Sequence, residues 1–272
     1  MAMKTAHLAG APARQIPVRR ISNKDVSLSL REGLNDFLAM RGDLIFVGLL
    51  YPLIGIAAAV LSANAPLMPF FLPVAAGVGL LGPVAAIGFY ELARRREAGQ
   101  TSNWSHFFDV RKRPAIDDIG IIVGLLLAMF AAWLVAAGIV YVLLFGWTAP
   151  SSVGSFVADV FTTPRGWALI AAGLVVGAAF AWIVLAVSVV SLPMLVDGDV
   201  DAADAVSASW RAAHANKPEM LRWGLTVAGL LVLGSIPLFI GLAFVLPWLG
   251  YATWHLYTRL IDRNAIPGLR NT

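Results

Sequence analysis

The stretch that decides the fold runs from residue 119 to residue 145 and reads IGIIVGLLLAMFAAWLVAAGIVYVLLF, without a charged side chain. A helix needs about 20 apolar residues to cross the roughly 30 Å hydrocarbon core of a bilayer. Three further charge-free stretches occupy residues 44–90, 166–196 and 223–258. The chain is 59% hydrophobic and 13% charged, whereas soluble domains are roughly 25% charged. These features predict a polytopic membrane protein.

Turn-forming residues divide the apolar stretches into six expected spans. The first stretch is interrupted at residues 62–66, which read SANAP, and the last folds back at residues 234–237, which read GSIP. A polar loop is expected after residue 145. The predicted fold class is all-α, a bundle of three helical hairpins with short interfacial helices on the cytoplasmic face. The expected spans are 44–62, 69–93, 118–145, 166–192, 218–235 and 239–260.

Basic residues predict the orientation of these spans. Nineteen of the twenty Lys and Arg residues lie in the N-terminal tail, after the second or fourth span, or in the C-terminal tail, and only Arg165 lies on the other side. Basic residues in short loops stay in the cytoplasm, so both termini are expected there. Residues 1–25 are predicted to be a disordered tail, 26–263 the membrane domain, and 264–272 a short cytoplasmic tail.

Composition also limits the expected ligands. The chain has no cysteine, which excludes disulfides, iron–sulfur clusters and thiolate metal sites. Its basic pI of about 9.7 is explained by a cytoplasmic face beside anionic lipid headgroups, so no nucleic-acid partner is expected. Four acids between Asp197 and Asp204 lack the Gly and the Glu of a calcium loop and are interpreted as a solvated helix start. No metal or cofactor is expected.

A short amphipathic segment precedes each predicted hairpin. Segments 25–50, 100–126 and 204–231 share a polar start, an apolar face and a Gly-Leu-Leu triplet, which suggests a threefold repeat about an axis along the membrane normal. Gly-Leu-Leu is also common in any membrane helix, so chance is the alternative. The aromatic residues of these segments are expected to bury against headgroups, the bundle or a partner protein. They are Trp104, Phe107, Phe108 and Trp210.

Four short runs resemble one family of uncharacterised bacterial, mainly alphaproteobacterial, integral inner-membrane proteins. The runs are Tyr51–Gly55, Gly82–Glu91, Asn216–Gly224 and Leu249–Tyr257. The resemblance covers roughly residues 30–262 and implies a membrane protein without an established activity. Some members carry the label cytochrome c oxidase subunit I-like. That chemistry needs several intramembrane histidines, whereas His255 alone falls in an expected span.

Two polar residues and two glycine pairs are candidate functional positions. Glu91 is expected to pair with Arg94 or Arg95 within its helix, with a gate or docking role as the alternative. His255 is interpreted as an interfacial residue of an aromatic belt, or alternatively as a haem or metal ligand or a pH-sensing group. The Gly-x-x-x-Gly pairs suit close packing of the third and fourth spans or of a partner helix. They are Gly120 with Gly124 and Gly173 with Gly177.

These observations favour a protein without enzymatic activity. No nucleophile, phosphate-loop or dinucleotide motif occurs. We expect an accessory, assembly or scaffolding factor of a membrane complex, and the oxidase-like label implies a respiratory one. The alternative is a transporter or channel for a small or amphipathic molecule, and a membrane enzyme ranks third.

The topology gives a direct test. Reporter fusions after residues 66, 152 and 236 should report a periplasmic position, and fusions after residues 100, 212 and 272 a cytoplasmic one, because the basic residues cluster beside the second set. A periplasmic signal after residue 100 would overturn both the orientation and the number of hairpins.

Overall fold

The computed structural model describes residues 16–40, 82–237 and 240–266. These residues are helical or irregular, apart from one isolated antiparallel bridge between Val18 and Ile261. The all-α fold class is therefore confirmed for the part of the chain that the structure describes.

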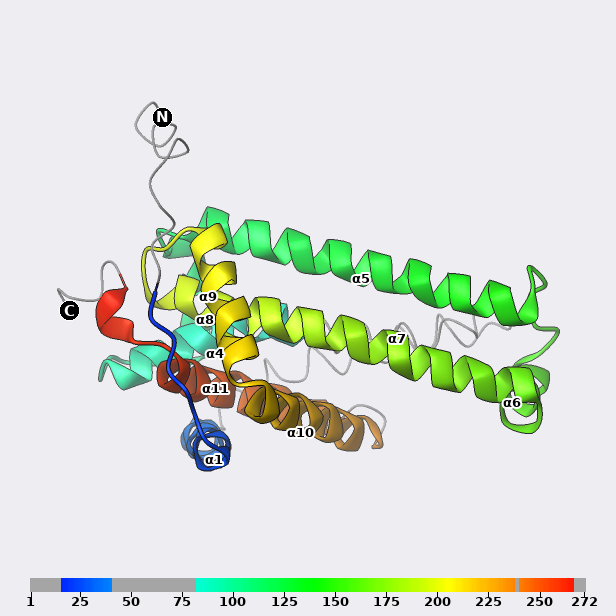
Figure 1. Ribbon diagram of the computed structural model, residues 1–272. Helices are drawn as coiled ribbons and strands as arrows, with labels where there is room; N and C mark the ends of the chain where they lie inside the picture. The colour runs from blue at the N-terminus through cyan, green and yellow to red at the C-terminus, as the bar shows by residue number, and fades with distance from the viewer. Residues whose placement is uncertain (1–15, 41–81, 238–239, 267–272) are drawn as a thin grey trace.

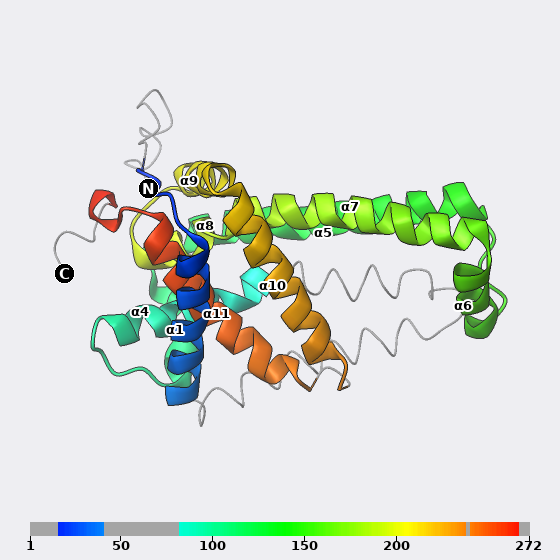
Figure 2. The same cartoon turned by 60° about the horizontal axis from the view of Figure 1, so that its bottom comes forward.

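Two long apolar helices project from the rest of the protein as a hairpin. α5 (Ile116–Phe145) and α7 (Pro164–Ser188) lie side by side along their length, as Figures 1 and 2 both show. By length and composition, Ile116–Phe145 and Pro164–Asp197 are the two described segments that could cross a membrane. Large apolar side chains remain exposed on both helices, and Leu143 is 79% exposed. Such a surface is stable only against lipid or another apolar surface.

A short helix closes the far end of this hairpin, where the sequence led us to expect a polar loop. α6 (Val153–Thr162) begins at a capping box in which Ser152 accepts a hydrogen bond from the Ser155 backbone N–H. Thr163 caps α7 in the same way through the Gly166 N–H. Trp147, which is 91% exposed, lies beside this end. Aromatic residues at such a place are typical of a membrane interface.

The other helices gather at the opposite end of the hairpin, in what we call the head. The described ends of the chain also lie there (Figures 1 and 2). α10 (Lys217–Ser235) leaves the head and slants away from the hairpin (Figure 2). The elements of the head are α1 (Asn23–Ala39), α4 (Gly82–Glu97), η3 (Trp104–Lys112), α8 (Ser191–Asp197), α9 (Ala202–Ala215), α11 (Leu242–Leu260) and η4 (Arg263–Ala265).

The three short amphipathic helices follow one packing rule. Each packs on the second helix of a neighbouring predicted hairpin: η3 on α4, α9 on α7, and α1 on α11. This order is cyclic, because α1 from the start of the chain covers the last hairpin. The arrangement is what a threefold repeat about one axis would produce.

The fourth predicted span, 166–192, differs from the structure because its helix is broken. α7 ends at Ser188 and α8 begins at Ser191. Pro193 has no N–H to offer the preceding turn. The N–H of Val190 instead donates to the hydroxyl of Ser209 on α9 at 3.1 Å. The break is therefore stabilised by a buried side chain rather than left open.

The remaining predicted spans have mixed outcomes. The span 44–62 and most of 69–93 lie outside the described residues, and α4 forms the end of the second. α10 and α11 cover the last two spans, with 19 residues each. The six-span topology therefore stays a prediction.

The predicted tails are shorter in the structure than in the sequence analysis. Ile16 and Ile266 are buried, and the Arg19 N–H donates to the Leu260 carbonyl at 2.7 Å. α1 begins with a capping box between Ser22 and Asp25, whose hydrogen bonds hold the pKa of Asp25 below its usual range. Residues 16–25 and 264–266 thus pack on the head, whereas residues 1–15 lie outside the described chain.

The close approach of the α1 and α11 backbones in the head predicts one sensitive position. A Cβ added at Gly33 of α1 would lie 2.4 Å from the backbone N of Ala252 on α11. Gly33→Ala should therefore destabilise the protein by about 1–3 kcal/mol, the usual cost of overpacking. Gly124→Ala is the control, because no described atom lies within 4 Å of its added Cβ. Thermal unfolding in detergent measures both, and equal midpoints would contradict the α1–α11 contact.

Candidate functional site

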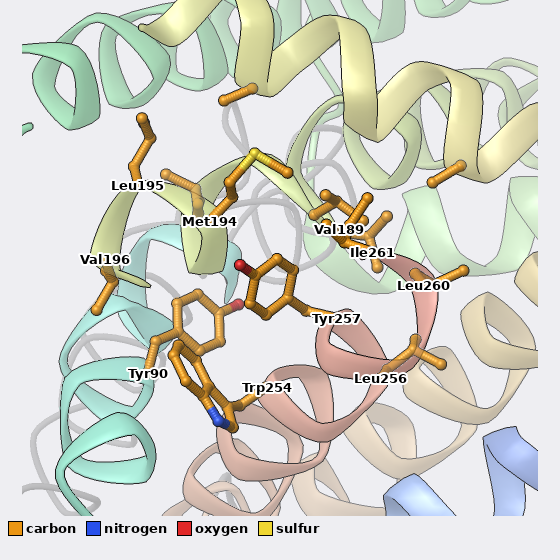
Figure 3. Packing of buried hydrophobic residues seen from close by; sticks show 14 of the residues in the cluster. Tyr90, Val189, Met194, Leu195, Val196, Trp254, Leu256, Tyr257, Leu260 and Ile261 are labelled. Carbon is orange, nitrogen blue, oxygen red and sulfur yellow. The ribbon is translucent and has the colours of Figure 1, made fainter. Parts of the chain in front are cut away.

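Three helices from different hairpins meet in the buried core of the head. Figure 3 shows Tyr90 of α4, the end of α7 with α8, and Trp254 and Tyr257 of α11 around one point. These three aromatic side chains are each at most 1% exposed. The second helices of the three predicted hairpins thus share one apolar core, and the polar groups at its edge form the candidate site.

The centre of that edge is a buried carboxylate. The side chain of Asp197, at the end of α8, is 0% exposed. Arg263 of η4 binds it with two hydrogen bonds, from Nε at 2.7 Å and from Nη2 at 2.9 Å. The hydroxyl of Tyr257 donates a third at 2.8 Å. A buried charge is stable only when it is paired and hydrogen-bonded in this way.

Glu97, at the end of α4, joins the same arginine from the other side. Its carboxylate accepts hydrogen bonds from Arg263 Nη1 and, at 2.9 Å, from the indole N–H of Trp254. The Arg263 guanidinium also lies 5.6 Å from the centre of the Trp254 ring. We call Glu97, Asp197, Trp254, Tyr257 and Arg263 the Arg263 cluster.

The electrostatics of this cluster favour the charged arginine. Partial burial lowers the pKa of Arg263, but its hydrogen bond with Asp197 and the charges of Asp197 and Glu97 together raise that pKa above its ordinary value. Arg263 therefore stays charged and bridges the ends of two helices. The cluster can hold those ends together, but it offers no free base or nucleophile.

No sequence pattern predicts this cluster. The prediction that Asp197 belongs to a solvated helix start is wrong, because Asp197 ends α8 and is buried. Asp201 and Asp204 do begin a helix, as the N-cap and the first turn of α9. The position of Asp197 in the sequence could have indicated its burial, because it is the first charged residue after the apolar stretch 166–196.

Glu91 forms the predicted pair and has one partner that was not predicted. It is 2% exposed and binds Arg94 through Nε at 3.1 Å and Nη2 at 2.9 Å. Arg113, 22 positions later in the sequence, adds two bonds at 2.9 and 2.8 Å. Glu91 therefore also fixes the loop that leads into α5.

His255 lies between two carboxylates of α1 rather than only among aromatic residues. Its Nε2 is 2.8 Å from Asp36 Oδ2, and its Nδ1 is 3.3 Å from Glu32 Oε2. Arg259 binds both oxygens of Glu32 at 2.7 Å, and Arg96 binds Asp36 at 2.7 Å. Both ring nitrogens of His255 have neighbours, so this histidine ties α1 to α11.

The four aromatic candidates do not form one surface. Phe107 packs under Gly88 and makes an edge contact with Phe89 at 5.1 Å, so it is partly buried against the core. Trp104 and Phe108 on η3 are 44% and 47% exposed. Trp210 lies on α9 and stacks on His214 at 4.4 Å. Since η3 packs on α4 and α9 on α7, Trp210 is separate from the other three.

The glycine pairs do not all serve the α5–α7 contact. A Cβ added at Gly177 would lie 3.1 Å from the Trp133 ring of α5. At Gly120, Gly124 and Gly173, no described atom lies within 4 Å of such a Cβ. One glycine therefore fits helix–helix packing within the hairpin, and the other three leave the predicted partner helix as the alternative.

No group of three or more His, Asp or Glu side chains in the described ranges could hold a metal ion.

A shallow groove of about 200 Å³ lies between α4, η3 and the start of α5.

Comparison with known proteins agrees with the membrane assignment. Residues 71–197 match the model of a family described as Predicted integral membrane protein (DUF2189). The matched segment ends at Asp197 and includes α4 to α8. The resemblance to an uncharacterised membrane-protein family is thus confirmed, while the taxonomic and oxidase-like labels stay predictions. No curated protein and no solved structure matched the chain.

The Arg263 cluster predicts that removing the charge of Arg263 lowers the stability of the protein much more than removing the charge of an exposed arginine. Arg263→Gln leaves Asp197 buried without its charge partner, which typically costs about 3–5 kcal/mol. Arg165→Gln is the control, because Arg165 and Asp159 form an exposed pair at 4.0 Å, and such pairs contribute about 0–1 kcal/mol. Thermal unfolding in detergent compares the two. Similar midpoints would show that Asp197 does not depend on Arg263.

Proposed function

We propose that this integral membrane protein has no enzymatic activity and serves as an accessory, assembly or scaffolding factor for a complex in the bacterial inner membrane. The oxidase-like label that the resemblance implies favours a respiratory complex. The observation that carries the proposal is the α5–α7 hairpin, which projects beyond the head with large apolar side chains and three glycines that no described residue covers. Glycines let another membrane helix approach closely. A hairpin of this kind suits packing against the helices of a partner.

The chemistry of the head supports a structural role. Its buried carboxylates, Glu91 and Asp197, are each held by arginine side chains. Catalytic groups instead need a free proton site or a reactive atom within reach of a substrate. The described ionic groups therefore serve to join helices.

The proposed topology has six spans with both termini in the cytoplasm. The head, with its many Arg side chains and both described chain ends, would lie on the cytoplasmic side. Arg165, beside α6 at the opposite end of the hairpin, would face the periplasm. This placement follows the tendency of basic residues to stay inside.

A transporter or channel is the second proposal, and the break between α7 and α8 favours it. Discontinuous helices commonly line transport paths, and α11 also contains Pro247 within the helix. In this reading the Arg263 cluster would close the path at the cytoplasmic end. Uptake by the purified protein in liposomes would support transport. Inert liposomes alongside a stable complex recovered from membranes would favour the scaffold.

The exposed aromatic side chains of η3 test the scaffold proposal. Trp104→Ala combined with Phe108→Ala should leave insertion and topology intact but weaken association with a partner complex. Burying one large aromatic side chain contributes roughly 1.5–3 kcal/mol, so their joint loss affects a typical interface strongly. Co-purification from native membranes in mild detergent, at matched expression and with mass spectrometry of the bound proteins, measures the effect.

Trp147→Ala is the matched control, because Trp147 is an exposed aromatic residue outside η3, between the end of α5 and the start of α6. Retention of the partner by this variant would place the interface at η3, whereas loss of the partner would place the interface at the α6 end of the hairpin. If the double variant is degraded or inserted wrongly, η3 packs for the bundle itself. If it binds every partner normally, η3 is not a docking surface.

A further inference from the structure

The groove beside η3 is apolar at its base and basic at its edge. Val84, Ile87 and Gly88 of α4 line one side, Phe107 and Phe108 of η3 another, and Ile119 of α5 the third. Arg111, in the last turn of η3, stands at the edge, 5.1 Å from the centre of the Phe108 ring. The groove thus offers an apolar surface for a hydrocarbon chain and, beside it, the positive charge of Arg111.

Arg111 differs from every other basic residue of this region. Arg94, Arg95, Arg96, Lys112 and Arg113 each pair with a carboxylate at 3.5 Å or less. Lys112, for example, binds Asp109 at 2.6 Å and lowers the pKa of that carboxyl group. No described carboxylate pairs with Arg111, which is exposed. Its charge is therefore available to an anion from outside the chain.

The depth of the groove fits the boundary between hydrocarbon and headgroups. Along α4, the apolar residues Val84 and Ile87 come before Glu91, and three arginines follow at 94–96. Arg113 binds Glu91, so the end of η3 lies at the level where α4 changes from apolar to charged. A lipid beside α4 would place its chains along Val84 and Ile87 and its phosphate near Arg111.

We propose that this groove binds one anionic phospholipid, with part of an acyl chain between α4, η3 and α5 and the headgroup phosphate on Arg111. Arginine suits this role because its planar guanidinium donates two parallel hydrogen bonds to a phosphate, and basic pockets between membrane helices are known to hold anionic headgroups. The Phe108 ring below holds the guanidinium in place through a cation–π contact. The inference rests on the proposed orientation, in which η3 lies at the cytoplasmic interface.

The test compares two neighbouring charge removals in the full-length protein. Purified protein in neutral detergent is titrated with phosphatidylglycerol or phosphatidylcholine of equal chain length, and bound lipid is counted by native mass spectrometry. Arg111→Gln should weaken phosphatidylglycerol binding by about fivefold or more, which is the gain in affinity that one basic residue gives near an anionic surface. Lys112→Gln removes the same charge, but Lys112 is already paired with Asp109. This variant should therefore change phosphatidylglycerol binding by less than about twofold. Arg111→Lys should recover part of the affinity.

Three outcomes would overturn the inference. Equal losses in Arg111→Gln and Lys112→Gln would indicate diffuse attraction rather than a site. Equal binding of phosphatidylcholine would remove the role of the headgroup charge, and displacement of the lipid by inorganic phosphate alone would indicate a simple anion site. Lipid binding is measured without any partner protein, so its failure and the failure of the scaffold proposal are distinguishable.

Discussion

The pairing of Arg263 with Asp197 is the interaction on which the arrangement of the head depends. A buried carboxylate must find a cation and hydrogen-bond donors, and the cation comes from a segment 66 residues later. That requirement brings the chain after α11 back beside α8, and Glu97 brings the end of α4 to the same arginine. The ends of the three predicted hairpins are thereby held at one point. The bridge between Val18 and Ile261 then places the described segment before α1 on the same surface.

This polar junction matters because apolar surface alone cannot arrange helices in a membrane. Lipid tails are as apolar as leucine, so burying a Leu between helices gains little there, and packing shape and hydrogen bonds decide which helices meet. The head uses both. Gly33 lets α1 approach the backbone of α11, and the hydrogen bond of His255 and the ion pair of Arg259 hold the same two helices together. The α5–α7 hairpin has fewer such contacts and keeps much of its apolar surface exposed.

Two residues that look equivalent in the sequence can have opposite environments in this protein. Phe107 and Phe108 are adjacent, yet the first packs under Gly88 and the second stands half-exposed beneath Arg111. The arginines of the same loop divide likewise between those that pair with carboxylates and Arg111. Such differences arise from where η3 rests on α4. They are also what gives the groove an apolar base and an available charge, the two features expected of a lipid site.

The sequence by itself determined the properties that depend on near neighbours. The apolar runs predicted α5 and α7, and the spacing of three predicted the pair between Glu91 and Arg94, because helix periodicity and hydropathy are local. Only the tertiary structure decided which distant groups meet. The carboxylates beside His255 lie about 220 positions earlier, and the break after Ser188 depends on Ser209 as well as on Pro193. The burial of Asp197 likewise depends on Arg263, a partner that no local pattern specifies.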